Sequence, residues 1–290
     1  MRSNEFYWFM QQRERLRIRK EAGEPWPWTG DEILQKYKFT NVKRENDRTT
    51  KWMRKNFTGQ HANLSNKEET LFNCAFFRYF GTMEFAQAAG WQAMHSFAKP
   101  SHRIKLKVLA RDRMKRKERV FTGAYIITNQ GLKKPKEEVV VDHFLLDFHK
   151  AAPSIIKVIN ETQSWEAAAT AMRKIQGFGG SGFMTKEVLQ DALHTPVFEK
   201  CMDLNTWCPV GPGARRGLNV LFNRPLKYRQ KEELFLAEMK ELYAQREQHW
   251  PEELCNLDLH DIQFQLCEWA KYTKVQTGVG KPRSLYRKDK

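Results

Sequence analysis

Four glycines within six residues could grip a phosphate group. They are Gly177, Gly179, Gly180 and Gly182, in the stretch KIQGFGGSGF (174–183). Glycine adopts positive φ angles without penalty, and without a Cβ it lets backbone N–H groups approach an anion closely. A helix after the glycines would add free amides and the positive end of its dipole. Such contacts hold a DNA backbone without reading its bases.

Other glycine-rich motifs fit this stretch less well. No Gly-Lys-Ser/Thr sequence follows, as in a Walker loop, and no strand is expected before it, as in a dinucleotide-binding fingerprint. A flexible linker is the remaining alternative. Apolar residues at helical spacing on both sides argue against a linker: Trp165, Ala168, Ala169, Met172 and Ile175 before the glycines, and Met184, Val188 and Ala192 after them. We therefore predict a helix–turn–helix hairpin over 164–193.

A carboxylate follows this hairpin, in VFEKCMDLNTW (197–207). Asp203 could cap a helix or serve in catalysis. The stretches IQGFG (175–179) and DLN (203–205) resemble the hairpin and the catalytic motif of the helix-hairpin-helix DNA glycosylase superfamily. The resemblance implies that Asp203, with Asn205 in the same motif, acts on a nucleotide flipped out of the stack. The hairpin lysine of bifunctional members and the iron–sulfur cysteines of others are absent, so a glycosylase-lyase is not expected.

The elements that must position these residues are mostly helices. Apolar spacing and capping signals predict helices at 4–20, 65–80, 102–119, 137–150, 164–175, 184–193 and 230–247. Thr29 with Glu32, and Ser65 with Glu68, have the spacing of capping boxes. AYIIT (124–128) and EVVV (138–141) are weak strand candidates. We predict an all-α fold.

The charge indicates a polyanionic partner. The chain has 290 residues with 50 Lys and Arg against 34 Asp and Glu, a net charge of +16. Such an excess favours nucleic acid as a partner, although it could also serve only solubility. The last residues, 271–290, are basic and punctuated by Gly and Pro, so we expect a flexible tail that could dock on a polyanion.

Cysteine usage and hydropathy narrow the setting. Five cysteines form no CxxC pair, so neither a disulfide framework nor a zinc ribbon is expected. We expect Cys201, Cys208 and Cys267 to be buried thiols rather than nucleophiles. Nothing in the sequence points to a metal or an organic cofactor. No apolar run approaches the length of a membrane span, so we expect a soluble, cytoplasmic protein with no membrane partner.

Four longer stretches resemble a phage DNA-hypermodification family. They are RERLRIRKEAGEPWPWTGDEILQKYKFTNVKRENDRTT (13–50), FFRYFGT (76–82), VGPGARRGLNVLFNRP (210–225) and LDLHDIQFQLCEWAKY (257–272). The family includes the helical domain attached to 5-hydroxymethyluracil DNA kinases. It also includes the alpha-glutamyl/putrescinyl thymine pyrophosphorylases, some of which act as amino acid:DNA transferases. The resemblance covers nearly the whole chain. It implies one helical, DNA glycosylase-like domain over 1–270, with an Arg- and Trp-rich N-terminal extension.

The resemblance implies chemistry on thymine-like bases in double-stranded phage DNA, in the host cytoplasm if a phage encodes the protein. A kinase phosphorylates the 5-hydroxymethyl group of hydroxymethyluracil, and a transferase then displaces the phosphoryl group with an amino acid or a polyamine. Such an enzyme needs a DNA clamp, a pocket for an extruded base, cations for the leaving phosphate and a base for the nucleophile.

Each requirement has candidate residues. The glycine hairpin and the basic stretch 102–119 would clamp DNA, and Asp203 would be the base or an electrostatic partner, with His61, His143 and His260 as further candidates. Arginine forks suit phosphate oxygens, and the candidates for phosphate are Arg13, Arg17, Lys20, Arg44, Arg215 and Arg216. Trp26 and Trp28, or Tyr125, would stack on the extruded base. The alternatives are solvated arginines, a Pro/Trp loop (23–34) that covers the core, and an ordinary turn at GPGARRGLN (211–219).

Three functions remain open. The preferred hypothesis is a transferase acting on a hydroxymethyluracil-derived base in DNA, with an amino acid or polyamine as co-substrate. A glycosylase that excises a modified base would use the same fold and Asp203. A non-catalytic module that presents DNA to a separate 5-hydroxymethyluracil DNA kinase is the third, because the chain has no P-loop of its own.

Overall fold

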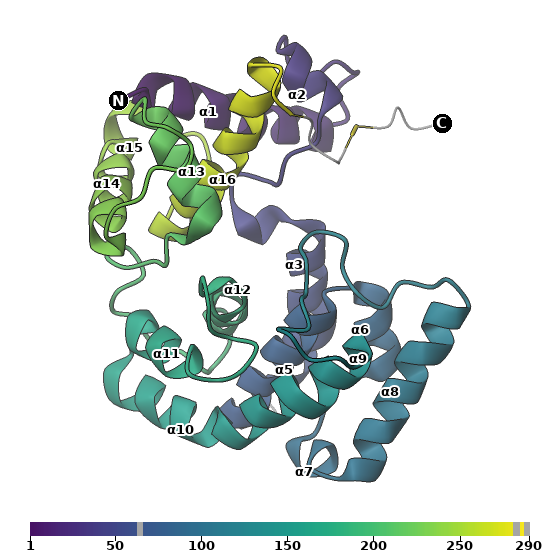
Figure 1. Cartoon of the computed structure of the whole chain (residues 1–290). Coiled ribbons are helices and arrows are strands. Elements are labelled where there is room, and N and C mark those ends of the chain that lie inside the picture. The colour runs from purple at the N-terminus through teal and green to yellow at the C-terminus, as the bar shows by residue number, and fades with distance from the viewer. Residues whose placement is uncertain (63–65, 281–284, 287–290) are drawn as a thin grey trace. The chain divides into compact units, whose positions relative to one another are not determined.

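The computed structural model describes residues 1–62, 66–280 and 285–286, and these are helical with connecting loops (Figure 1). No strand occurs in these ranges beyond one isolated bridge between Tyr37 and Leu285. The predicted all-α fold is confirmed. Contacts within the chain define two compact units: unit 1 joins Met1–Asp47 to Leu204–Lys290, and unit 2 is the segment Arg48–Asp203. The single domain expected over 1–270 stays a prediction.

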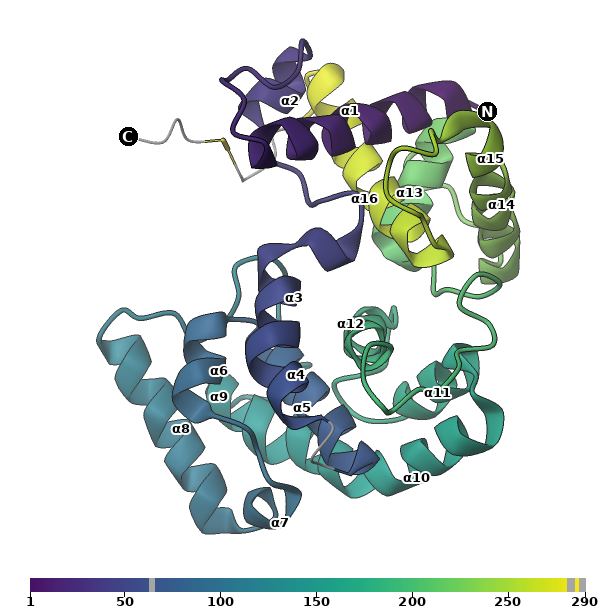
Figure 2. The same ribbon diagram turned by 180° about the vertical axis from the view of Figure 1, so that it is seen from behind.

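Unit 1 is built from both ends of the chain. Its helices are α1 (Ser3–Glu21), α2 (Glu32–Lys36), η1 (Arg44–Asn46), α13 (Gly211–Leu221), α14 (Glu232–Ala244), α15 (Arg246–His249) and α16 (Leu259–Gln276). The aromatic residues of α1 and α16 form its core, where Phe9 packs against Trp269 and Tyr272 with ring centroids 5.5 and 4.8 Å apart. Figure 2 shows α1 crossing α16, and the two helices are in contact. The apolar face of α1, the predicted Arg-rich helix, is therefore held in this core.

Helix α13 packs closely on α16, and two of its glycines make this possible. A Cβ on Gly217 would collide with the carbonyl of Leu266, and a Cβ on Gly213 would reach the thiol of Cys267. The stretch GPGARRGLN, for which a turn was considered, is therefore a helix that lies close to its neighbour.

Unit 2 contains the remaining helices. They are α3 (Arg48–Met53), the π-helix η2 (Arg54–Thr58), α4 (Gly59–His61), α5 (Lys67–Phe80), α6 (Met83–Ala89), α7 (Met94–Phe97), α8 (Pro100–Lys115), α9 (Lys136–Val139), the π-helix η3 (Val140–Leu145), α10 (Leu146–Thr162), α11 (Trp165–Met172) and α12 (Phe183–Ala192). α5 is almost entirely buried and contacts α10 and α12. Of the two hairpin helices, α12 packs on α5, whereas α11 packs on α10 and α12.

A buried ion pair joins α5 to α12. The guanidinium of Arg78 donates two hydrogen bonds to the carboxylate of Asp191 and lies 3.5 Å from that of Glu187. Burial alone would lower the pKa of Arg78, but the two carboxylates raise it above its ordinary value. Breaking one partner of such a pair leaves an uncompensated buried charge, which costs about 3–5 kcal/mol. The pair therefore fixes the second hairpin helix on α5.

Several local predictions are corrected by the structure. The N-cap of α2 is Asp31, whose carboxylate accepts from Leu34 N, rather than Thr29. The N-cap of α5 is Asn66, and Ser65 lies outside the described residues. The EVVV stretch is helical and AYIIT is a loop. The last helix, α16, continues to Gln276, so the first residues of the expected tail are helical.

Candidate nucleic-acid site

The predicted hairpin is present in unit 2, and Asp203 is tied directly to it. The Asp203 carboxylate accepts from the Ser164 hydroxyl at 2.7 Å, from Trp165 N at 2.7 Å and from Glu166 N at 3.0 Å. Ser164 is itself the N-cap of α11, because its Oγ accepts from Ala167 N at 3.0 Å. Asp203 thus satisfies amides that a helix leaves unpaired at its start. Of the two roles predicted for Asp203, the structure shows the helix cap, on the helix that begins the hairpin, and the catalytic role stays a prediction.

The chain before Asp203 is held by one side chain. The Oε1 atom of Gln163 accepts from the backbone N–H of Glu199 and of Lys200, at 3.1 and 3.0 Å. Gln163 also accepts at its carbonyl from Met202 N, at 2.9 Å. Its φ of +47° ends α10 and turns the chain into α11. These contacts fix the position of Asp203 relative to the hairpin.

A second carboxylate lies beside Asp203. Glu166 is exposed at the first turn of α11, and burial and the neighbouring charge of Asp203 raise its pKa above the ordinary value of 4.5. Glu166 was not among the predicted site residues; its place two residues after a Ser N-cap was the only available signal. The thiol of Cys201 lies 3.5 Å from the Asp203 carboxylate as a donor, and burial, with that charge, raises its pKa to about 11. Cys201 is therefore a thiol at neutral pH.

The glycine turn is packed on one side and open on the other. Gly177 has φ +94°, and a Cβ there would collide with Tyr79 and Phe144. Phe178 is fully buried and stacks on Phe148 with centroids 4.5 Å apart. Gly180, with φ +65°, has nothing within 4 Å of the Cβ position. The turn is therefore anchored by Phe178 and exposed at Gly180.

The turn and the start of α12 have unused backbone donors. Among the described residues, the N–H groups of 179–181 and of 183–185 donate no hydrogen bond, although Met184 and Thr185 are buried. Gly182 forms the N-cap of α12 with φ +73°. Lys174, which sequence analysis passed over although it directly precedes the turn, is exposed. This arrangement of amides, helix dipole and cation is suited to an anionic oxygen.

An aromatic pair borders the turn. Tyr125 lies edge-on to Phe183, with centroids 5.1 Å apart, and its hydroxyl donates to the carbonyl of Arg78. Phe183 is 41% exposed and starts α12. The structure thus brings Tyr125, one of the predicted stacking residues, to the hairpin. Phe183 was missed because an apolar residue at that position fits a helix core equally well.

The predicted cations of α1 have partners inside unit 1. Arg13 is buried, donates to Gln265 and to the carbonyl of Thr40, and burial lowers its pKa to about 10. Arg17 pairs with Glu14 and Glu21. Lys20 lies over the rings of Trp28 and Tyr286, at 5.3 and 5.6 Å. These contacts occupy Arg13 and Arg17 within the fold.

The other predicted residues of unit 1 differ in exposure. Arg44 lies 3.9 Å from Asp47, and Arg215 lies 3.0 Å from Glu232. Arg216 is exposed and has no partner among the described residues. Trp26 is 45% exposed, whereas the indole of Trp28 donates to the carbonyl of Glu24. Asn205 accepts from Leu259 N at 3.3 Å, at the start of α16.

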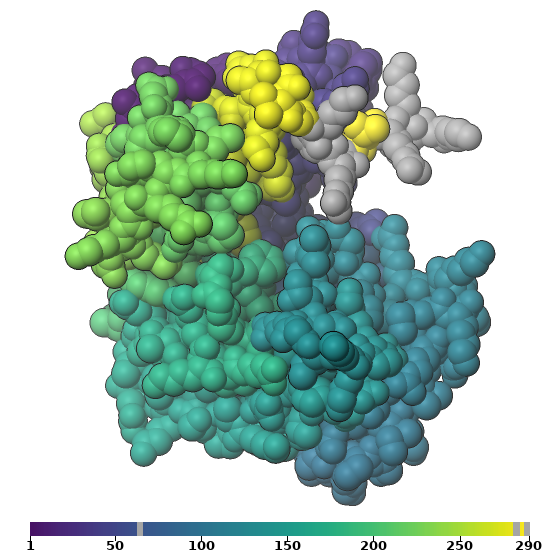
Figure 3. All heavy atoms as spheres, viewed as in Figure 1, coloured from purple at the N-terminus to yellow at the C-terminus, as the bar shows by residue number. Residues whose placement is uncertain are grey.

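The basic stretch 102–119 forms α8 and the turn after it, on the surface of unit 2 (Figure 3). Many of its cations are paired: Arg103 and Lys107 with Asp142, and Arg111 with Glu137. Lys105, Lys117 and Arg119 are exposed and have no partner among the described residues. A third of the nine Lys and Arg residues of this stretch therefore present uncompensated charge.

The histidines are dispersed. His143 contacts Lys134 at 3.2 Å, His260 is buried 3.4 Å from the Cys208 thiol, and His61 stacks on Trp91. No group of three or more His, Cys, Asp or Glu in the described ranges could hold a metal ion. The helices in those ranges also include none that is long and apolar enough to span a bilayer.

Comparison with known proteins assigns this all-α chain to the helical domains of phage DNA-modifying proteins. The family model described as "5-hmdU DNA kinase, helical domain" matches residues 2–281, so the chain belongs to that family. The 5-hmdU DNA kinase of Bacillus phage SP10 is 25% identical over 273 residues. That match covers 86% of this chain and 41% of the relative, so the chain spans less than half of the relative's length. No solved structure matches the chain.

The predicted family is confirmed. The part in thymine hypermodification, the glycosylase-like fold, the transfer reaction, the co-substrate and the individual site residues stay predictions.

Proposed function

We propose that this protein is a DNA base-hypermodification enzyme that transfers an amino acid or a polyamine to a phosphorylated 5-hydroxymethyluracil base. The observation that carries the proposal is the hydrogen-bonded union of Asp203 with the first helix of the glycine hairpin. A module that only bound DNA would use this carboxylate only as the cap of α11, whereas a transferase would also use its charge. Family membership supplies the substrate class.

The reaction is a substitution at the exocyclic methylene carbon. A bond forms between that carbon and the amine nitrogen of the nucleophile, and the carbon–oxygen bond to the phosphate breaks. The phosphate leaves with the bonding electron pair, and the amine gives up a proton. Cations near the leaving group stabilise its charge, and a base takes the proton.

The hairpin supplies the grip on DNA. The backbone N–H groups of 179–181 and 183 and the ammonium of Lys174 can bind phosphates without reading sequence. α11 has eight residues, a length of about 12 Å, and lies between Asp203 and the glycine turn in the sequence of contacts.

The carboxylates of Asp203 and Glu166, both at the start of α11, have different roles in the reaction. Three donors engage the oxygens of Asp203, so this residue serves best as a fixed negative charge that orients the incoming ammonium. Glu166 is exposed, and its pKa is raised by burial and by Asp203, so it takes the proton from the nucleophile.

The test is mass spectrometry of nucleosides from duplex DNA containing 5-phosphomethyluracil, incubated with the protein and a pool of amino acids and polyamines. We expect a heavier nucleoside and released phosphate, with a loss of about 100-fold or more in Asp203→Asn. Ser164→Ala is the matched control, because it removes a cap from the same helix and leaves the carboxylate. Free base with abasic sites would identify a glycosylase instead.

A second candidate is a DNA-presenting partner of a separate kinase. The observation that favours it is that the chain matches 41% of a kinase. It predicts that DNA is bound and chemically unchanged, and that the protein raises the activity of a 5-hydroxymethyluracil DNA kinase.

A further inference from the structure

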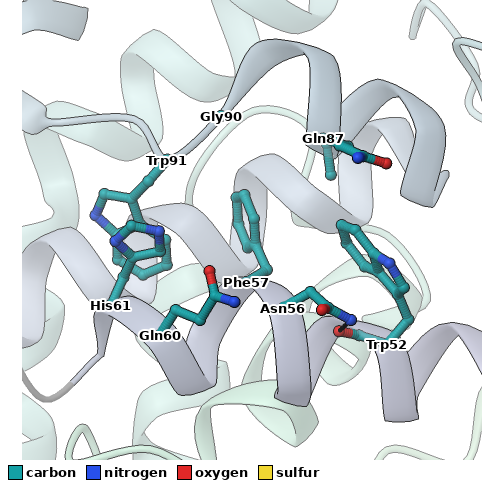
Figure 4. A pocket seen from close by; sticks show the side chains of 9 residues that line it. Trp52, Asn56, Phe57, Gln60, His61, Gln87, Gly90 and Trp91 are labelled. Carbon is teal, nitrogen blue, oxygen red and sulfur yellow. Dashed lines mark hydrogen bonds between the residues drawn. The ribbon is translucent and has the colours of Figure 1, made fainter.

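A pocket of about 320 Å³ opens in unit 2, away from the glycine turn (Figure 4). Its walls come from the segment α3–η2–α4, from α6 and from the loop after α6. A volume near the lower end of the range for ligand sites, about 300–1,000 Å³, suits one small ring system. The residues that line it are Trp52, Asn56, Phe57, Gln60, His61, Ala86, Gln87, Gly90 and Trp91.

Aromatic rings form the walls. Figure 4 shows Trp52 at one end of the pocket, Trp91 with His61 at the other, and Phe57 between them. His61 stacks on Trp91 with centroids 4.8 Å apart, and Phe57 lies 5.2 Å from Trp91. The indole of Trp91 donates to Glu69 at 2.9 Å, which holds that ring in place. The rings are therefore fixed before any ligand arrives.

The polar groups of the pocket are amides. Gln60 and Gln87 make no side-chain hydrogen bond with any residue that the structure describes, and Asn56 only donates to the carbonyl of Trp52, at 3.1 Å. Each amide offers a donor and an acceptor side by side. The same pairing lets Asn and Gln bind base edges with two hydrogen bonds.

The lack of charged residues in the lining argues against a charged ligand. The lining contains no Asp, Glu, Lys or Arg. A phosphate would call for cations, and the ammonium groups of an amino acid or a polyamine would call for carboxylates. A neutral, planar ring with donors and acceptors on its edge satisfies both the aromatic walls and the amides.

The backbone of this wall is built around a π-helical turn. The N–H of Gly59 donates to the carbonyl of Arg54, five residues earlier, and a Cβ on Gly59 would collide with that carbonyl. This wider turn contains Asn56 and Phe57 and is followed directly by Gln60 and His61, and all four residues line the pocket. π-turns of this kind occur frequently at functional sites.

We propose that this pocket binds an unpaired nucleobase of the DNA substrate. The inference rests on DNA binding within the proposed function and is independent of the transfer step. α5 connects the pocket to the hairpin through neighbouring residues. Phe77 stacks on Trp52 with centroids 6.1 Å apart, and Arg78 pairs with Asp191 of α12. The single helix α5 would therefore hold the hairpin, which binds the DNA strand, at a fixed distance from the pocket, which binds the base.

The test is photo-cross-linking with DNA that carries one 5-iodouracil, in a single strand and at a mismatch in a duplex. This base couples to aromatic side chains that it stacks against, and peptide mass spectrometry locates the coupled residue. We expect coupling to Trp52, Phe57, His61 or Trp91. Coupling only to residues elsewhere, such as Trp26, Trp28 or Tyr125, would overturn the proposal.

Two variants test the contacts. The double variant Gln60→Ala/Gln87→Ala removes exposed amides that bond to no described residue, and Trp52→Leu removes one ring. We expect each to reduce cross-linking at the pocket by at least about fivefold, the low end for one lost base contact. Trp8→Phe, at an exposed tryptophan of unit 1, is the control and should change nothing.

Binding of the same DNA, measured in parallel, separates this inference from the function on which it rests. If DNA binds to the wild type but does not couple at the pocket, the pocket proposal alone is wrong. If DNA does not bind, the pocket proposal and the proposed function are both wrong. Coupling at the pocket by free 5-iodo-2′-deoxyuridine but not by DNA would also overturn the proposal, because the ligand would then be a nucleoside.

Discussion

At the scale of single residues, the site depends on how one carboxylate is shared. Asp203 accepts from a hydroxyl and two backbone amides, and a thiol lies 3.5 Å away. A carboxylate that is held in this way contributes to the stability of α11 and also presents a fixed negative charge. A substitution that keeps the cap of α11 and removes the negative charge, or the reverse, can separate the two contributions.

The first prediction concerns the pH dependence of the reaction. If Glu166 takes the proton, the rate rises with pH as Glu166 ionises and levels off above its pKa. Because that pKa is raised, the rise lies above pH 4.5, the ordinary value. Glu166→Gln should flatten this limb of the pH–rate profile of kcat/KM. An unchanged profile in the variant would assign the proton to another group.

The second prediction concerns Cys201. Burial, with the charge of Asp203, raises the pKa of its thiol from 9.0 to about 11, so the native protein holds little thiolate at pH 8. The rate of alkylation by iodoacetamide should keep rising to about pH 11 in the native protein and level off above about pH 9 in urea. Peptide mass spectrometry gives the rate for this one residue. Fast alkylation of native Cys201 at pH 8 would contradict the structure.

At the scale of elements, glycines decide how closely the helices and turns approach their neighbours. In the hairpin they serve two purposes, since Gly177 fits under Tyr79 and Phe144 whereas Gly180 faces open space. In α13 the glycines let a helix touch α16. Each of these roles predicts a different penalty for an added methyl group.

The third prediction compares the two turn glycines. Gly177→Ala combines an unfavourable φ of +94° with a steric clash and should cost about 2–4 kcal/mol of unfolding free energy. Gly180→Ala meets only the backbone penalty, about 1 kcal/mol. Urea unfolding measures both. Equal costs would mean that the turn is not anchored as described.

The fourth prediction reverses the usual preference for Ala in helices. An exposed Gly→Ala change in a helix stabilises it by about 1 kcal/mol. Gly217→Ala should instead destabilise the protein by about 1–3 kcal/mol, because the new Cβ meets the carbonyl of Leu266. Gly213→Ala meets a side-chain thiol, which can move, so its cost should be smaller. Thermal unfolding compares the two variants.

The elements also show what the sequence could predict. The helices of the hairpin were predictable because apolar residues recur at helical spacing over both. EVVV was ambiguous, since a short β-branched run fits a strand or a buried helix. The bonds of Asp203 to Trp165 and Glu166 join residues 38 and 37 positions apart, which no local pattern reveals. The pocket likewise combines separate segments, and its π-turn has no sequence signal.

At the scale of the whole molecule, the charge of +16 is the dominant feature. Much of the basic surface is neutralised by nearby acids, as on α8, and exposed cations such as Lys174 and Arg216 stand out against it. Affinity for DNA depends on such uncompensated charges, because each phosphate contact releases counterions.

The fifth prediction is a measured salt dependence. The logarithm of the DNA association constant should fall linearly with the logarithm of salt concentration, with a slope of about −0.9 per phosphate contacted. Lys174→Ala should make the slope shallower by about one. Lys157→Ala, at an exposed residue of α10 that pairs with Glu161, is the control. Fluorescence anisotropy with labelled duplex DNA gives both slopes.

The division of the chain has a consequence for synthesis on the ribosome. Unit 2 is one continuous segment, so it can fold as soon as Asp203 has emerged. Unit 1 cannot, because Tyr7 donates to the carbonyl of Leu242, 235 residues later. Contacts of such sequence separation form slowly. The hairpin and Asp203 would therefore fold before α14 and α16 have been synthesised. Until then the aromatic residues of α1 have no core to pack into, and the N-terminal segment is the part of the nascent chain most exposed to aggregation.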